Sequence, residues 1–515
     1  MLFWLIAKKD FLLNLISARF VIGFLLCIVI IPFTVIVSVD NYLSQVQVYK
    51  IEQERAEKAY KEVRVWSALS PTVVSEPTVL SIFSTGISNN MGNKSQIKMR
   101  EHQLFPSGHM ISRDNPLLNA FFTIDFSKVV AILISLLALV FSYDAITRER
   151  EEGTMKLTLT SRTSRITFLF GKLTGLLLTL LPILLFCYML ACLIIMFNPG
   201  ISISASDWGG IMLLFFTSII YMLVFLLIGM LISSLVSRSS SSIILSLICW
   251  IWFLFLLPNI ATYLSQSFVK APLYDNVENA MNDYDKEYMK GMSESFERIR
   301  KELNIENISY WNNNGDGFGY AEMSGVTKET ALFHQRLSIW QADVLLNNAD
   351  KKWILQKDYL DGLVRQQAWQ QRIAWLSPSE IFGQTTNTLC RTDMQSFLKY
   401  MEQVRNYREV FYRFYADKKL IESFAYFTGH AFEDLYSQEE ADNIEGGIWR
   451  LLDEQNVSNN MFPYLNTDEV PRFVSQPVTL ATVLNSAMSR ITALLGLMVA
   501  LLIASIAAFM KYDVR

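Results

Sequence analysis

The sequence predicts a mainly α-helical, polytopic membrane protein with six transmembrane helices and a largely helical extracytoplasmic domain. Of the 515 residues 51% are apolar and only 18% are charged, whereas soluble domains carry roughly 25% charged residues. Long uncharged stretches recur along the chain. This composition argues against a disordered chain or a collagen-like fibre. The net charge of −3 lacks the basic excess typical of nucleic-acid binding.

Six stretches satisfy, or nearly satisfy, the requirement of about 20 mostly apolar residues for a bilayer-spanning helix. They are residues 20–39, 126–143, 173–197, 209–237, 239–257 and 491–510. The fifth stretch could extend to Leu264, and the second contains one charge, Lys128, near its end. A single run of this kind could be a buried core helix, but six of them favour a membrane bundle.

The spans divide the chain into alternating segments. We expect an interfacial amphipathic helix at 1–18, the first span at 19–39, an extracytoplasmic segment at 40–125, four spans at 126–264 that enclose a cytoplasmic loop at 144–172, a large helical extracytoplasmic domain at 265–485, and the last span with a cytoplasmic tail at 486–515. Residues 1–18 could instead be the frayed start of the first span.

Lys and Arg gather beside one set of span ends, and the short loop 198–207 has none. This bias places both termini in the cytoplasm, with Arg490 a minor exception.

The two long polar segments are expected to pack together outside the membrane. Helices are predicted through Val63 and over 276–304, 327–376 and 386–419, the last of them after a break at 378–383. Pro32, Pro182 and Pro258 lie inside apolar runs. We expect them to kink their helices, with neighbouring groups satisfying the freed carbonyls.

No catalytic or metal-binding motif emerges from the sequence. The chain lacks GxxxxGK[ST], so it cannot hydrolyse ATP through a P-loop. The five cysteines include no CxxC pair, which disfavours thiolate-bound zinc and a disulfide framework. A membrane-bound enzyme would need ionisable groups within the bilayer. Asp125 and Lys128 lie at the outer end of the second span, where snorkelling explains them.

Three weaker patterns suggest metals. Residues 312–317 resemble the start of a calcium loop, but position twelve would be Met323 in place of the required Glu, so a polar turn is favoured. His430 and Asp434 have i, i+4 spacing on a predicted helix, where a surface hydrogen bond is the simpler interpretation. Thioether and imidazole groups suit Cu(I). Such groups occur in a loosely spaced cluster made of Met99, His102, His109 and Met110.

The most informative stretch is 143–175, YDAITREREEGTMKLTLTSRTSRITFLFGKLTG. It is short and rich in charge, and it joins two predicted spans. Gly153 can end a helix in a left-handed cap, after which Thr154 can start another turn. The stretch therefore predicts a helix–turn–helix, although an ordinary solvated loop is the alternative.

This stretch resembles ABC exporter permeases of the polysaccharide and drug exporter type. The matching residues are Asp144, Glu149, Arg150, Glu151, Gly153, Thr154, Ser164, Arg165, Gly171 and Lys172. Residues 6–20 are similar to that family's N-terminal elbow helix. The outer insert, through 376–407, resembles the subgroup related to copper-enzyme-maturation permeases of the nitrous oxide reductase type. Thr163 is a departure, since the family often has proline before the Ser-Arg pair.

The resemblance implies a transporter permease subunit that is not itself an enzyme and binds no cofactor. Separate cytoplasmic ATPase subunits would hold ATP and Mg, and a second permease, identical or homologous, would complete a dimer in the inner membrane of a bacterium, among its lipids. The ATPase-coupling residues would be Asp144, Glu149, Arg150, Glu151, Gly153, Thr154 and Arg165. The alternative is a non-transporting device that acts on an extracytoplasmic protein, as in lipoprotein release or metalloenzyme maturation. No substrate and no nucleic-acid partner is indicated.

Overall fold

The computed structural model describes residues 2–88, 93–97, 124–155, 164–270, 274–306, 308, 311–312, 323–324, 327–445, 450, 464–476 and 478–511. The helices of the membrane bundle are α1 (Leu2–Ile16), α2 (Ala18–Lys61), α4 (Phe126–Ser142), α5 (Thr147–Glu151), α7 (Arg165–Met196), α8 (Ala205–Leu235), α9 (Ser239–Ile251), the π-helical segment η4 (Trp252–Leu256), α10 (Leu257–Phe268), α13 (Pro378–Leu389) and α17 (Leu480–Met510). The remaining α-helices are α11 (Tyr274–Glu302), α12 (Lys328–Ala374), α14 (Met394–Asp417) and α15 (Gln438–Asp442). The short 3₁₀ segments are η1 (Trp66–Ala68), η2 (Val79–Ile82), η5 (Leu420–Glu422), η6 (Phe424–Tyr426) and η7 (Phe432–Asp434).

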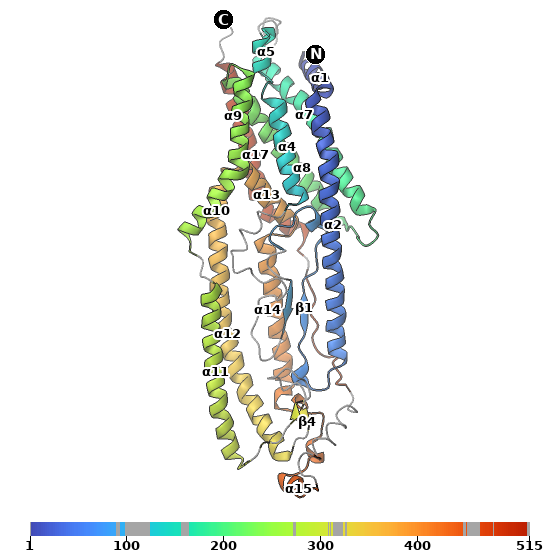
Figure 1. Ribbon diagram of the computed structural model, residues 1–515, viewed down its shortest axis with the longest axis vertical. Helices are drawn as coiled ribbons and strands as arrows, with labels where there is room; N and C mark the ends of the chain where they lie inside the picture. Colours follow the sequence, from blue (N-terminus) through green and yellow to red (C-terminus); the bar gives the residue numbers. More distant parts are fainter. Residues whose placement is uncertain are drawn as a thin grey trace.

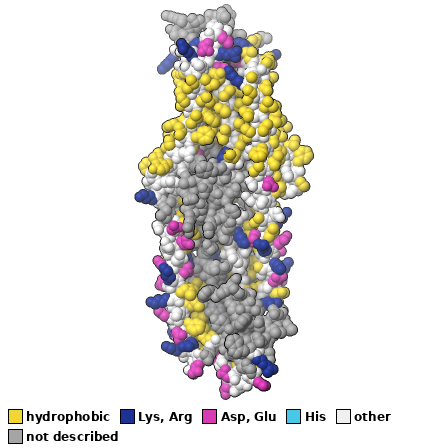
Figure 2. Space-filling view, viewed as in Figure 1, with side chains coloured by type: hydrophobic (Ala, Val, Ile, Leu, Met, Phe, Trp, Pro, Cys, Tyr) yellow, Lys and Arg dark blue, Asp and Glu magenta, His cyan; other side chains and the backbone are white. Residues whose placement is uncertain are grey.

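The molecule is elongated, with the apolar bundle at one end (Figure 1). Both termini lie with α5 at the tip of the bundle, while α11, α12 and α14 extend toward the opposite tip, where α15 lies. On the face shown in Figure 2, hydrophobic side chains form a broad belt over the bundle, with charged side chains above it and further charged side chains below it. Within the described residues six helices are long and apolar enough to cross a membrane. The predicted mainly α, polytopic fold class is therefore confirmed.

The helix α2 leaves the bundle without interruption. Ser17 caps its start, where the Ser17 hydroxyl accepts a hydrogen bond from the Phe20 N–H at 3.4 Å. Its first half is apolar and its second half, from Asp40 onward, is polar. The helix predicted through Val63 is thus one continuous rod with the first span. The preceding α1 is a separate helix, and its placement in the membrane interface stays a prediction.

The core of the bundle depends on a close approach of α4 and α8. A Cβ added at Gly229 would lie 1.9 Å from the Ser142 Oγ and 2.9 Å from its Cβ. The Ser142 hydroxyl is already committed, since it donates to the Ala138 carbonyl at 2.6 Å. Only glycine therefore fits at this crossing, in keeping with the small residues that bring membrane helices together.

We expect Gly229→Ala to lower the free energy of unfolding by about 1–3 kcal/mol, the usual cost of overpacking a core. Thermal unfolding of the purified chain checks this. Adding Ser142→Gly should restore most of the loss, because it removes the clashing atoms. If Gly229→Ala unfolds like the wild type, the described approach of α4 and α8 is wrong.

The fifth span bends at a π-helical segment, and Figure 1 shows α10 diverging from the direction of α9. In η4 the Leu257 N–H bonds to the Trp252 carbonyl five residues back. The next carbonyl, Phe253, has no equivalent donor because Pro258 lacks an N–H. The hydroxyls of Ser377 and Ser379 donate to it instead, at 2.6 and 2.5 Å. The expected satisfaction of a freed carbonyl by a neighbouring helix is confirmed here.

The two outer segments pack against each other, as predicted. The hydroxyls of Tyr60 and Tyr407 lie 2.7 Å apart, and the Tyr415 hydroxyl donates to the Trp66 carbonyl at 2.8 Å. Helices α11 and α12 lie side by side (Figure 1). Two antiparallel strand pairs complete the described part: β1 (Thr72–Val74) with β2 (Lys94–Gln96), registered Thr72↔Gln96, and β3 (Trp311–Asn312) with β4 (Met323–Ser324), registered Trp311↔Ser324.

The predicted break at 378–383 is wrong. Pro378 occupies the first turn of α13, where its missing N–H costs nothing, and Gly383 lies inside the same helix. The helix predicted over 386–419 is instead interrupted between α13 and α14, where Arg391 has φ of 61°. The sequence also missed that α13 belongs to the bundle. Its Phe382 ring stacks on Tyr221 of α8 with ring centroids 4.4 Å apart.

Snorkelling is the wrong explanation for Asp125. Its side chain is fully buried and caps α4, accepting hydrogen bonds from the Lys128 N–H at 2.9 Å and the Thr85 N–H at 3.2 Å. Burial raises the pKa of Asp125, and these hydrogen bonds and the Lys128 charge oppose the rise. The carboxyl thus has a structural role at the start of the second span.

Candidate functional site: the charged hairpin beside the termini

The stretch 143–175, called the hairpin below, runs from the end of α4 into α7, and its helix α5 lies at the tip of the bundle (Figure 1). Its first helix, α5, is short, and Gly153 follows it with φ of 72°, which confirms the predicted left-handed cap. Residues 156–163 lie outside the described residues. The chain then enters α7, whose start is capped by the Ser164 hydroxyl, the acceptor of the Thr167 N–H at 3.1 Å.

The first residues of the hairpin are tied to α2 through Arg19. The Arg19 guanidinium donates to the Asp144 carboxylate at 2.9 Å and to the Tyr143 hydroxyl at 2.8 Å. The same guanidinium lies 4.9 Å from the centre of the Tyr143 ring. A charge-assisted bond with a cation–π contact holds the base of the hairpin to the first span.

Behind α5 lies a buried ion cluster that joins three helices. The ammonium of Lys172, on α7, is 2.6 Å from Glu149 of α5 and 3.0 Å from Asp10 of α1. The Lys172 side chain is only 7% exposed. Lys9 approaches Glu149 from the surface at 3.9 Å. Burial raises the pKa of Asp10, and the charge and hydrogen bond of Lys172 oppose this rise. One ammonium therefore forms ion pairs with two desolvated carboxylates.

Close packing of α1 on α7 makes this cluster possible. A Cβ at Gly175 would lie 2.9 Å from both the Ala7 carbonyl oxygen and the Asp10 Cβ, and one at Gly171 would lie 2.9 Å from Ile6. These two glycines are four residues apart and so share one face of α7. They form a small-xxx-small surface that lets the α1 backbone approach.

Arg150 and Glu151 bind the neighbouring helix ends. The Arg150 guanidinium donates to the carbonyls of Val236 at 2.9 Å and Ser234 at 3.3 Å, at the end of α8. The Glu151 carboxylate accepts from the Ser239 N–H and hydroxyl, both at 2.8 Å, at the start of α9. A cation thus lies at a helix C-terminus and an anion at a helix N-terminus, which suits both helix dipoles.

We expect Glu151→Ala to lower the free energy of unfolding by about 1 kcal/mol, the typical cost of losing an N-cap. Glu151→Gln should retain much of this stability, because its amide oxygen can still accept. Chemical denaturation of the purified variants checks the ranking. An alanine variant as stable as the glutamine variant would contradict the capping role.

Arg148 of α5 and Glu152, the residue directly after α5, lie on the outward side of this helix. Their side chains pair at 2.8 Å and are 58% and 51% exposed. The hydrogen bond from Arg148 lowers the pKa of Glu152. This pair therefore presents fixed charge to anything that docks on the tip.

Comparison with known proteins agrees with this architecture. Residues 4–514 match the family model described as ABC-2 family transporter protein. The chain belongs to this family. No curated protein matches the sequence. The ABC-2 family consists of transporter membrane components, so the chain is a multi-pass membrane protein, and membership implies association with ABC ATPases.

Within this ABC-2 protein, the predicted coupling residues Asp144, Glu149, Arg150, Glu151, Thr154 and Arg165 make contacts within their own chain. Thr154 donates to the Glu149 carbonyl at 3.4 Å. Arg165 donates to the Met510 carbonyl at the end of α17 at 2.5 Å. Their contact with an ATPase stays a prediction.

Sequence reasoning missed the inner half of the site. Lys172 appeared in the Gly-Lys pair, but its buried partners were invisible because Asp10 lies 162 residues away in the chain. The available signal was Asp10, the one acidic residue of a mainly apolar N-terminal helix that also contains Lys8 and Lys9. Such a residue needs a partner once the helix packs.

The predicted metal patterns receive no support from the described residues. Among these, no group of three or more His, Cys, Asp or Glu side chains could hold a metal. Met99, His102, His109, Met110 and most of 312–317 lie outside them. The helix predicted to carry His430 and Asp434 is wrong, since His430 precedes a 3₁₀ segment, η7, that ends at Asp434.

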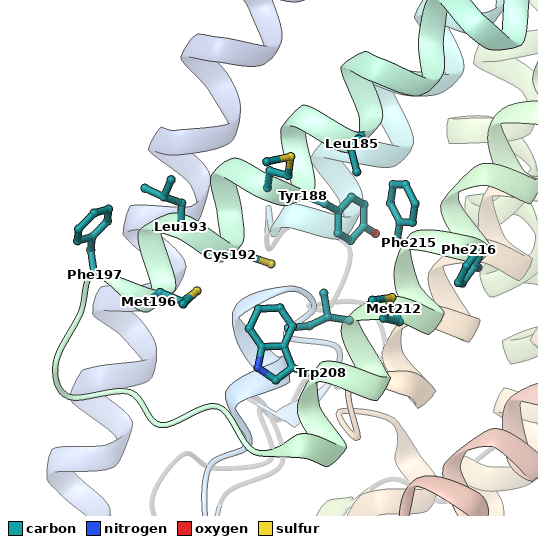
Figure 3. A pocket seen from close by; sticks show the side chains of 12 residues that line it. Leu185, Tyr188, Cys192, Leu193, Met196, Phe197, Trp208, Met212, Phe215 and Phe216 are labelled. Atoms are coloured by element: carbon teal, nitrogen blue, oxygen red, sulfur yellow. The ribbon is translucent and has the colours of Figure 1, made fainter.

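A separate apolar groove lies between α7 and α8 near their connecting loop (Figure 3). Its volume is about 740 Å³, and its walls include Leu193, Trp208 and Phe216. The Tyr188 hydroxyl, the polar tip of one wall, lies 2.8 Å from the Ser218 hydroxyl. The groove suits apolar material and offers no chemistry for orienting a polar ligand.

Proposed function

We propose that this ABC-2 protein is the permease subunit of an exporter in a bacterial inner membrane, driven by a separate cytoplasmic ATPase that docks on α5. In this arrangement both termini and the hairpin are cytoplasmic, and α11, α12 and α14 are extracytoplasmic. The single observation that carries the proposal is the hairpin itself. The buried Asp144 and Glu149 pair with Arg19 and Lys172, Arg150 and the exposed Glu151 bind the ends of α8 and α9, and the Arg148–Glu152 pair is also exposed.

This geometry suits the transmission of force. A load applied to α5 reaches the Lys172 ion cluster and the Arg19–Asp144 pair directly. Long packed helices respond to such loads as rigid bodies, because packed interfaces move between discrete arrangements. ATP-driven closure of two docked ATPases would therefore move the first, third and fourth spans together. A second permease, identical or homologous, would provide the other docking site.

The test exchanges the exposed charges and preserves their pairing. In the double variant Arg148→Glu with Glu152→Arg, the internal ion pair persists but the charge pattern offered to a partner is reversed. We expect about tenfold weaker copurification of the ATPase, equivalent to about 1.4 kcal/mol, because rim charges set register and association.

The matched control is the exposed i, i+4 pair Lys58–Glu62 on the distal part of α2. Exchanging these two charges should leave the complex intact. Equal loss in both variants, or no loss in the α5 variant, would contradict docking on α5.

A second candidate is a non-transporting device that works on an extracytoplasmic protein, as the resemblance to the nitrous oxide reductase type suggests. The continuous rod of α2 favours it, since one helix links the bundle to the distal region. Spin labels on α11 and on α2 would measure ATP-dependent distance changes in the reconstituted complex. A change without movement of solute across the vesicle membrane would favour this candidate over export.

A further inference from the structure

A cavity of about 440 Å³, with a polar side and a larger apolar side, lies at the boundary between the bundle and the distal region. Its walls come from the start of α4, the bend of the fifth span at η4 and α10, the end of α12, and α13. Cavities of 300–1,000 Å³ are typical of small-molecule sites. The π-helical segment η4 contributes Leu254 and Phe255, and such segments are frequent at functional sites.

The polar wall carries opposite charges. Glu380 of α13 and Lys128 of α4 both line the cavity. The Gln384 amide donates to the Glu380 carboxyl at 2.9 Å. Burial raises the pKa of Glu380 although Gln384 and Lys128 oppose it. A cation placed beside this carboxyl would favour its ionised form.

The remaining wall is apolar and reaches exposed apolar side chains of the fifth span. Ile132, Leu254 and Phe382 line the cavity, as does Phe255, which is also 45% exposed. Beyond it, Leu256 and Tyr263 are exposed on the same bent span, at 46% and 72%. An acyl chain could lie along these side chains while a polar head enters the cavity.

We propose that this cavity binds the zwitterionic headgroup of an amino-phospholipid, with its ammonium beside Glu380, its phosphate beside Lys128, and its acyl chains along Phe255. An acidic and a basic side chain in one cavity match a ligand that carries both signs, and the apolar wall matches its tails. The inference goes beyond the proposed function, because this binding requires no ATPase. A failure of the docking test and a failure of this one are therefore distinguishable.

The experiment measures binding of short-chain fluorescent phosphatidylethanolamine and phosphatidylglycerol to the full purified chain. We expect Glu380→Gln to lower the affinity for phosphatidylethanolamine about tenfold, a usual scale for losing one charged contact. The affinity for phosphatidylglycerol should not change, because this lipid has no ammonium. Gly383→Leu should weaken both lipids. An added Cβ at Gly383 meets nothing within 4 Å, so the larger side chain enters open space in the cavity.

Gly496→Leu is the matched control, because a Cβ there also meets nothing within 4 Å but Gly496 lies on α17, outside the cavity walls. It should bind both lipids normally. If neither Glu380→Gln nor Gly383→Leu lowers the affinity for phosphatidylethanolamine, this cavity is not the lipid site. If Glu380→Gln lowers the affinity for both lipids equally, Glu380 does not bind the ammonium. Equal affinity for soluble phosphoethanolamine would overturn the lipid as the source of the headgroup.

Discussion

Replacing Lys172 with methionine is expected to lower the free energy of unfolding by about 3–5 kcal/mol, the cost of removing one partner from a buried ion pair. The reason is the geometry of the cluster. Glu149 and Asp10 lie 2.6 and 3.0 Å from this ammonium, and both are nearly inaccessible to water. Without Lys172 two desolvated carboxylates would face each other. Unfolding of the purified chain in increasing denaturing detergent, followed by circular dichroism, gives the measurement.

Lys9→Met is the control for the charge itself. Lys9 touches the same Glu149 at 3.9 Å, but its side chain is 56% exposed. Its loss should cost less than about 1 kcal/mol, as for surface pairs. Adding Glu149→Gln and Asp10→Asn to Lys172→Met should recover part of the stability, because no buried charge then remains unpaired. Equal effects of Lys172→Met and Lys9→Met would contradict the buried cluster.

Gly175→Leu is expected to uncouple the ATPase from the membrane-spanning helices while the fold is largely retained. The new side chain would collide with the α1 backbone, where even a Cβ would approach the Ala7 carbonyl to 2.9 Å. Helix α1 must then move away from α7, and Asp10 moves with it. We expect about tenfold lower stimulation of the copurified ATPase by the permease, equivalent to about 1.4 kcal/mol of lost coupling.

The ATPase rate of the reconstituted complex is the readout, with Gly496→Leu as the matched glycine replacement in open space. Ethanolamine-lipid binding by Gly175→Leu should stay normal, since the cavity lies at the other end of the bundle. Unchanged ATPase stimulation would show that the packing of α1 on α7 has no part in coupling.

Apolar length was sufficient to predict the six spans, because a bilayer imposes a minimum run of apolar residues on each helix. Gly153 was also readable, since its left-handed φ is a local property. The placement of α13 was not readable. Its sequence is mixed, and what draws it into the bundle is contact with α8, α17 and the bend of the fifth span, all distant in the chain.

The sequence was sufficient to predict that this site is a charged stretch, but not which contacts its side chains make. The sequence suggested that Glu149 faces a partner, whereas it lies against Lys172 and Lys9 of its own chain. Charge pattern alone cannot separate an outward carboxylate from one that has an internal partner. Only tertiary packing shows that Arg148 and Glu152 form the exposed pair.

Site-specific cross-linking can detect whether an ATPase docks on the outward side of α5. A cysteine replaces Glu152, and a matched one replaces Glu62 on the distal part of α2, where its side chain is equally exposed at 51%. We expect Glu152→Cys to cross-link to the copurified ATP-binding-cassette subunit and Glu62→Cys to leave it free. Cross-linking from Glu62→Cys, or none from Glu152→Cys in an intact complex, would contradict this docking.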